Sequence, residues 1–107
     1  MSPEPVPPAD LGTLTQEQMA PLVGDTFRMQ VSPDQEIAVT LAEAKKLSAA
    51  RPGQRAPFSL IFRPADPKFY APQQIFPITH PRLGMLEIFL VPIRPDATGA
   101  RFEAVFT

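Results

Sequence analysis

Histidine, cysteine, carboxylate and hydroxyl side chains are the groups from which a catalytic or metal site is built, and here they form no useful pattern. His80 is the only histidine and there is no cysteine, which excludes a multi-histidine metal site, cysteine-ligated metal and thiol chemistry. The acidic residues form no Asp-x-Asp calcium loop, and no Gly-x-Ser-x-Gly motif is present. The sequence therefore predicts a protein that is not an enzyme and uses no cofactor, with His80 in a structural or solvated role.

The most apolar stretch of the chain runs from residue 85 to residue 93. Successive residues of a strand face opposite sides of a sheet, so a strand here has two apolar faces. One face carries Leu86, Ile88 and Leu90. The other carries Phe89, Val91 and Ile93. We therefore expect a central strand that is covered on both faces, with Phe89 buried.

Glu87 is the one charged residue inside this apolar stretch. An unpaired charge in such a position is costly, so one hypothesis is a buried ion pair between Glu87 and an arginine on a neighbouring strand. The candidate arginines are Arg63, Arg101 and Arg28. The alternative is that Glu87 lies on a solvent-exposed patch of the sheet.

Length and charge limit the remaining classes of protein. A chain of 107 residues is long enough for one domain with a real core. Ten basic and eleven acidic residues give a net charge of −1 without a basic cluster, so we expect no nucleic-acid partner. The N-terminal region has no Sec signal pattern and no apolar run reaches membrane length, so we expect no membrane insertion. The compartment stays open, either cytoplasmic or exported as part of an assembly.

Residues 1–13 are expected to form an extended, proline-rich arm in front of a single β-rich domain at residues 14–107. Proline fixes the backbone in a polyproline-type conformation and removes the amide that a regular strand needs. A disordered tail is the alternative. The residues that we expect to dock on a partner are Pro3, Pro5, Val6, Pro7 and Pro8.

The sequence of residues 14–107 predicts a mainly β fold. A short helix over residues 16–23 is indicated by the capping-box pattern of Thr15 and Gln18. Alternating apolar residues then predict six strands, near 26–31, 36–46, 58–63, 74–79, 85–93 and 102–106. Within residues 41–50 a helix is the alternative to the strand. Gly84 and Gly99 are expected to supply positive φ in the turns that flank the last hairpin.

The expected architecture is a small antiparallel six-stranded barrel or sandwich with one short N-terminal helix. Pro77 interrupts the fourth strand, which indicates an edge or a bulge there.

Four segments, at residues 58–63, 78–84, 86–93 and 101–106, together resemble an uncharacterised family of bacterial domains of about 100 residues that ends in a "LELFLVPI … RYEAVF" pattern. The resemblance covers residues 24–107, and this chain has Phe102 where the family commonly has Tyr. It implies no catalytic residue. Members of the family tend to occur near phage-tail-collar or tail-fibre-like proteins, which implies an assembly or surface role. The matching segments also favour a strand over residues 36–46.

Two functions follow as hypotheses. The first is a non-enzymatic structural module that forms a homo-oligomer or docks on a fibre-like protein through its arm and sheet. The second is a small-ligand-binding barrel, with an apolar pocket lined by Phe and Met and covered by the short helix.

Overall fold

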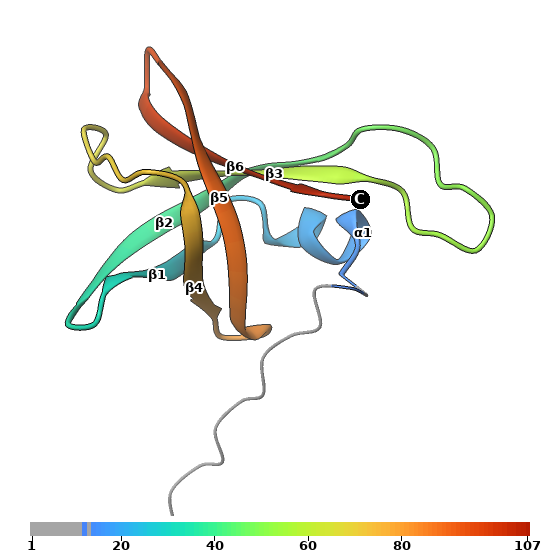
Figure 1. The fold of residues 1–107 in the computed structure, drawn as a ribbon, viewed down its shortest axis with the longest axis horizontal. Coiled ribbons are helices and arrows are strands. Elements are labelled where there is room, and N and C mark those ends of the chain that lie inside the picture. The colour runs from blue at the N-terminus through green and yellow to red at the C-terminus, as the bar shows by residue number, and fades with distance from the viewer. Residues whose placement is uncertain (1–11, 13) are drawn as a thin grey trace, which may run out of the picture.

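Six antiparallel strands close into a barrel in the order β1-β2-β3-β6-β5-β4 in a computed structural model of the protein (Figure 1). The structure describes residue 12 and residues 14–107, so the proline-rich arm lies outside the described part of the chain. The strands are β1 (Thr26–Ser32), β2 (Gln35–Lys46), β3 (Phe58–Pro64), β4 (Gln74–His80), β5 (Gly84–Asp96) and β6 (Gly99–Phe106). The prediction of a mainly β, six-stranded antiparallel fold is confirmed, and the barrel is the correct one of the two architectures.

Strands β1 and β2 form the predicted hairpin, with Thr26 opposite Thr40 and Met29 opposite Ile37. Strand β2 continues past its partner and pairs with β3 as far as Lys46. The strand prediction for residues 36–46 is therefore confirmed over the helical alternative. A register shift between Leu41 and Glu43 bends β2 where it passes from one partner to the other.

Strand β5 changes partner in the same way. Its first half, Gly84 to Leu90, pairs with β4, and its second half pairs with β6 from Val91 onward. Two long strands thus belong to both halves of the barrel, which is how six strands close a sheet on itself without a free edge.

Barrel closure corrects the prediction that both faces of β5 are covered. Leu86, Ile88 and Leu90 point inward and are at most 1% exposed, but Phe89 on the opposite face is 50% exposed. The apolar pattern alone did not show that the sheet curves into a barrel whose second face meets solvent.

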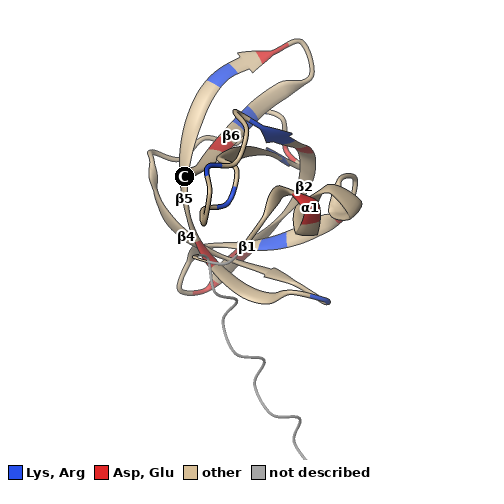
Figure 2. Cartoon of the chain, turned by 90° about the vertical axis from the view of Figure 1, so that its right-hand side faces the viewer, with Lys and Arg blue, Asp and Glu red and all other residues tan. Residues whose placement is uncertain are grey.

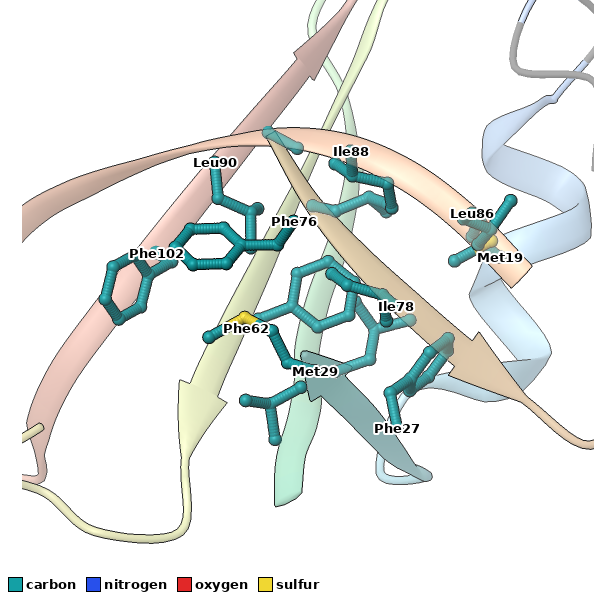
Figure 3. Packing of buried hydrophobic residues seen from close by; sticks show 14 of the residues in the cluster. Met19, Phe27, Met29, Phe62, Phe76, Ile78, Leu86, Ile88, Leu90 and Phe102 are labelled. Carbon is teal, nitrogen blue, oxygen red and sulfur yellow. The ribbon is translucent and has the colours of Figure 1, made fainter. Parts of the chain in front are cut away.

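The short helix closes one end of the barrel. It comprises α1 (Gln16–Met19) and a 3-10 turn η1 (Ala20–Leu22), and the capping box of Thr15 and Gln18 is present. Met19 is fully buried in the same cluster as the barrel residues (Figure 3). The Gln16 side-chain amide donates to the Ala44 carbonyl of β2 at 2.8 Å, which fixes the helix on the barrel. Neither helical segment of the described residues is long enough to cross a membrane.

Large apolar side chains fill the barrel interior. The rings of Phe27 and Phe62 meet edge to face with centroids 5.4 Å apart, and Phe76 meets Phe102 at 6.3 Å. Figure 3 shows these side chains pointing inward from different strands. The alternation predicted from the sequence is confirmed in β1, β4 and β6, whose inward residues are buried. In β3 the inward residues are buried as predicted, but Ser59 and Ile61 of the opposite face are buried too.

Proline and glycine mark the places where the strands stop or turn. Gly84 and Gly99 have φ of 76° and 124°, as predicted. Pro77 stands next to the last residue of the β1–β4 ladder, which pairs only Arg28 with Thr79 and Met29 with Ile78. Because proline has no amide hydrogen, it cannot donate to the next rung, so Pro77 lies at a local edge inside a closed barrel.

Candidate functional site

Both ring nitrogens of His80 form hydrogen bonds. Its Nε2 lies 3.0 Å from Asp25 Oδ2, its Nδ1 accepts from the Arg82 amide at 3.0 Å, and its ring lies 4.6 Å from the Phe27 ring. An Nδ1 that accepts leaves Nε2 as the donor to the carboxylate. The side chain is 4% exposed, and both of its nitrogens already have hydrogen-bond partners within the protein. This is the arrangement of a structural histidine that ties β4 to the segment before β1.

Glu87 does not form the predicted buried ion pair. It lies exposed on the outer face of β5, opposite Pro77, and no ion pair of the described residues includes it. Arg63 and Arg101 both approach Asp96 instead, and Arg28 lies 4.0 Å from Glu36. Of the two hypotheses for Glu87, the structure therefore agrees with the solvent-exposed one. Because β5 faces solvent on this side, the charge of Glu87 needs no partner.

Asp96 is the centre of the charge cluster that the arginines form. Arg63 binds it through two parallel hydrogen bonds, Nη1 to Oδ1 at 3.0 Å and Nη2 to Oδ2 at 2.5 Å. The Arg63 guanidinium holds the pKa of the Asp96 carboxyl well below its usual range, with help from the Thr98 amide and from Arg101. Arg101 also donates to the Arg94 carbonyl across the hairpin. The cluster joins β3 to the β5–β6 hairpin and leaves no carboxylate oxygen in an open pocket.

Three large apolar residues come together on the outer face of the barrel. Ile75 of β4 and Phe89 of β5 are direct cross-strand partners, so both point outward, and Val105 of β6 lines the same groove. Their exposed fractions are 61%, 50% and 56%. We call Ile75, Phe89 and Val105 the outer patch. Isolated exposed apolar residues are ordinary, whereas a contiguous group is typical of an interaction surface.

The outer patch borders an open groove of about 430 Å³ between β5 and β6. The β5–β6 ladder begins at Val91 and Glu103, so the strands diverge beyond this pair. Residues from both strands, together with Gly12 and Arg55, line the groove. Arg55 closes its end, since the guanidinium donates to the carbonyls of Leu14 and Thr107.

A second groove, of about 370 Å³, lies at the other end of the β5–β6 hairpin, where the loop after β3 crosses it. Aromatic and proline side chains form much of its walls, and Tyr70 is 72% exposed. We call it the Tyr70 groove. Its apolar lining consists of Pro67, Phe69, Tyr70, Pro92, Ile93, Pro95, Ala100 and Phe102. Lys68, Arg94 and Arg101 also line it, so its polar groups are basic.

Among the residues that the structure describes, no three His, Cys, Asp or Glu side chains lie close enough to hold a metal ion. Basic and acidic residues are scattered over the ribbon (Figure 2). The Phe and Met side chains proposed as a ligand pocket, such as Phe27, Met29 and Phe62, pack on one another in the core.

Sequence reasoning missed both grooves. The arm residues Pro3, Pro5, Val6, Pro7 and Pro8 lie outside the described residues. Ile75 and Tyr70 were not singled out, although Ile75 has the parity opposite to the inward Phe76 and Ile78 and was therefore recognisable as an outward apolar residue. Tyr70 stands in a loop, where no periodicity indicates its direction.

Comparison with curated proteins and with solved structures finds no match. A family model does match, over residues 14–106, which is nearly the whole β-rich domain. The matched range begins at Leu14, the residue before the helix cap, and ends with the last residue of β6. The chain therefore belongs to the family described as a domain of unknown function, DUF6916.

Proposed function

We propose that this protein is a non-enzymatic assembly module that associates with copies of itself, or with a phage-tail-like or surface-fibre partner, through its outer patch and its N-terminal arm. The observation that carries the proposal is the outer patch. Ile75, Phe89 and Val105 are each at least half exposed and border one groove.

The surroundings of the patch support burial against another protein surface. The patch stands on three strands of a closed barrel, so its backbone is already held by strand pairing and loses little freedom on binding. Glu87 lines the same groove and supplies a polar edge, which is the usual arrangement of an interface with an apolar centre.

The test is the oligomeric state of the full chain with Phe89→Asp. Because the side chain is half exposed, the variant should fold, and the charge should prevent burial of the patch. We expect sedimentation velocity to show self-association of the wild-type chain that the variant loses, by about tenfold or more in the association constant.

The matched control is Leu47→Asp, because Leu47 is also 50% exposed but follows the end of β2 and does not line the groove of the outer patch. It should associate as the wild type does. Equal association of the Phe89 and Leu47 variants with the wild type would overturn a role for the patch. A wild-type chain that stays monomeric at every concentration would overturn self-association.

A further inference from the structure

The Tyr70 groove has the chemistry of a site for a polyproline helix. Proline-rich peptides dock in grooves walled by aromatic and proline side chains, because their extended conformation is already formed and little entropy is lost on binding. Here Tyr70 stands at the surface, while Phe69 and Phe102 form the inner wall with ring centroids 6.0 Å apart.

The groove is built before any ligand arrives. The Ala100 amide donates to the Pro67 carbonyl at 2.9 Å, which ties the loop after β3 to the β5–β6 hairpin. Within the loop, Asp66 accepts from the Lys68 and Phe69 amides. Gly99 passes so close to Pro67 that an added Cβ would lie 2.4 Å from the proline Cβ. The two walls are therefore fixed relative to each other.

The chain carries a segment that matches this groove. Pro5 and Pro8 are three residues apart, which places them on one side of a polyproline helix with three residues per turn. Residues 1–11 contain Glu4 and Asp10 and no Lys or Arg, whereas the groove has Lys68 and Arg94 on its rim. Neither of these two basic residues has an ion-pair partner among the described residues, so both charges are available to the arm's carboxylates.

The arm of the same chain is too short to place Pro8 in its own Tyr70 groove. Gly12 lies beside Phe106 and Thr107, whereas the groove borders Ala100 to Phe102 at the opposite end of β6. Six residues of strand from Thr107 to Arg101 rise about 20 Å. The four residues from Gly12 back to Pro8 span at most about 14 Å. The arm of a second copy is not tied to Gly12 of this chain, so this distance does not limit it.

From this geometry we infer that the Tyr70 groove is the receptor for the proline-rich arm of a second copy of the chain, with Pro5 and Pro8 against Tyr70 and with Glu4 and Asp10 near Lys68 and Arg94. The inference rests on the proposed self-association and names the surface that the arm uses.

Tyr70 also provides the test, because it is the only tyrosine in a chain without tryptophan. Its fluorescence in the full-length protein reports the groove directly, and sedimentation velocity on the same dilution series reports the mass. We expect the emission to change together with the mass. A peptide of residues 1–11, which contains no aromatic residue, should compete and return the protein to monomer.

Two variants of the full chain complete the test. Tyr70→Ala should weaken self-association by about tenfold or more, and Pro5→Ala with Pro8→Ala should do the same. A chain that carries all three substitutions should associate little more weakly than either variant, because Tyr70 and the two prolines take part in the same contact. The control is Leu47→Ala, an exposed apolar truncation outside the groove, which should associate as the wild type does.

The possible failures are distinguishable. If the mass changes on dilution but Tyr70 emission does not, or if Tyr70→Ala associates normally, self-association stands and the groove is not its receptor. If the chain stays monomeric and its Tyr70 emission responds to the proline substitutions, the arm binds its own chain and the inference is overturned. If the chain stays monomeric and its Tyr70 emission does not respond to the proline substitutions, both the inference and the proposed self-association are overturned.

Discussion

At the residue scale, Phe62 and Phe89 show that an apolar residue of a strand is not always buried. Phe62 is fully buried and packs edge to face on Phe27, whereas Phe89 is half exposed in the outer patch. Both lie in strands of high apolar content, so the side of the barrel to which each points decides its contribution to stability.

Phe62→Ala should lower the free energy of unfolding by about 3–5 kcal/mol, because it removes a buried ring and leaves a cavity in the core. Phe89→Ala should cost less than about 1 kcal/mol, because water already reaches half of that ring. Urea denaturation of both variants, at a concentration where the protein is monomeric, makes the comparison. A loss at Phe89 as large as that at Phe62 would contradict its outward position.

The Asp96 carboxylate makes the free energy of unfolding depend on pH. Its carboxyl pKa is lowered in the folded state by Arg63, so its contribution is fully present above the pKa of the unfolded chain, about 3.9, and is lost as the pH falls toward the lower folded value. The difference in urea midpoint between the wild type and Asp96→Asn should therefore be largest above about pH 5 and should shrink in more acidic buffer.

Asp34→Asn is the matched control for the acid titration, because Asp34 stands in the β1–β2 turn and forms no ion pair among the described residues. A gap between wild type and Asp96→Asn that does not narrow in acid would show that the carboxylate charge does not stabilise the hairpin.

At the scale of elements, the β5–β6 hairpin depends on contacts outside itself. Arg101 donates to the Arg94 carbonyl within the hairpin, Asp96 receives Arg63 from β3, and the loop after β3 lies against Gly99. The turn at Gly99 is thus fixed by its own positive φ and by the close approach of Pro67.

Gly99→Ala should be more destabilising than Gly53→Ala. Both glycines have positive φ, so alanine is strained at either position by about 1–2 kcal/mol. At Gly53 the new methyl group meets no atom within 4 Å, whereas at Gly99 it meets Pro67 at 2.4 Å. Thermal unfolding of the two variants measures the difference, and equal losses would mean that the loop moves away without cost.

At the scale of the whole molecule, the barrel, the helix at its end and the C-terminus form one body. Arg55 links the parts, since its guanidinium donates to the carbonyls of Leu14 and Thr107 and lies 5.6 Å and 5.7 Å from the ring centroids of Phe58 and Phe106. The family model covers this body and begins after the arm, which separates the domain from the segment that we assign to assembly.

Deletion of residues 1–10 should leave a folded barrel with a nearly unchanged thermal midpoint for the monomer, because the core, the helix cap and the Arg55 contacts lie in residues 14–107. Self-association should become sharply weaker, since the prolines that we propose as the docking residues are gone. Circular dichroism measures the first quantity and sedimentation velocity the second. If the shortened chain assembles as well as the full one, the arm has no part in assembly.

Most of the strands, the hairpin turns and the inward residues could be predicted from the sequence, because these depend on local alternation and on glycine and proline. Phe58, Leu60 and Phe62 were recognisable as core residues, and Thr15 with Gln18 as a helix cap, without any knowledge of distant contacts. The exposure of Phe89 and Glu87 was not, since an apolar strand looks the same whether its second face is covered or meets solvent.

The surfaces that the molecule presents depend on how the strands pair and close into a barrel. Closure of the barrel through the short β1–β4 ladder gave the sheet an inner and an outer side. On the outer side, the pairing of β5 with β4 and with β6 brought Ile75, Phe89 and Val105 together from three strands. The Tyr70 groove likewise joins a loop to a hairpin about thirty residues further along the chain. Such surfaces depend on contacts between distant segments, and the periodicity of a single segment carries no information about them.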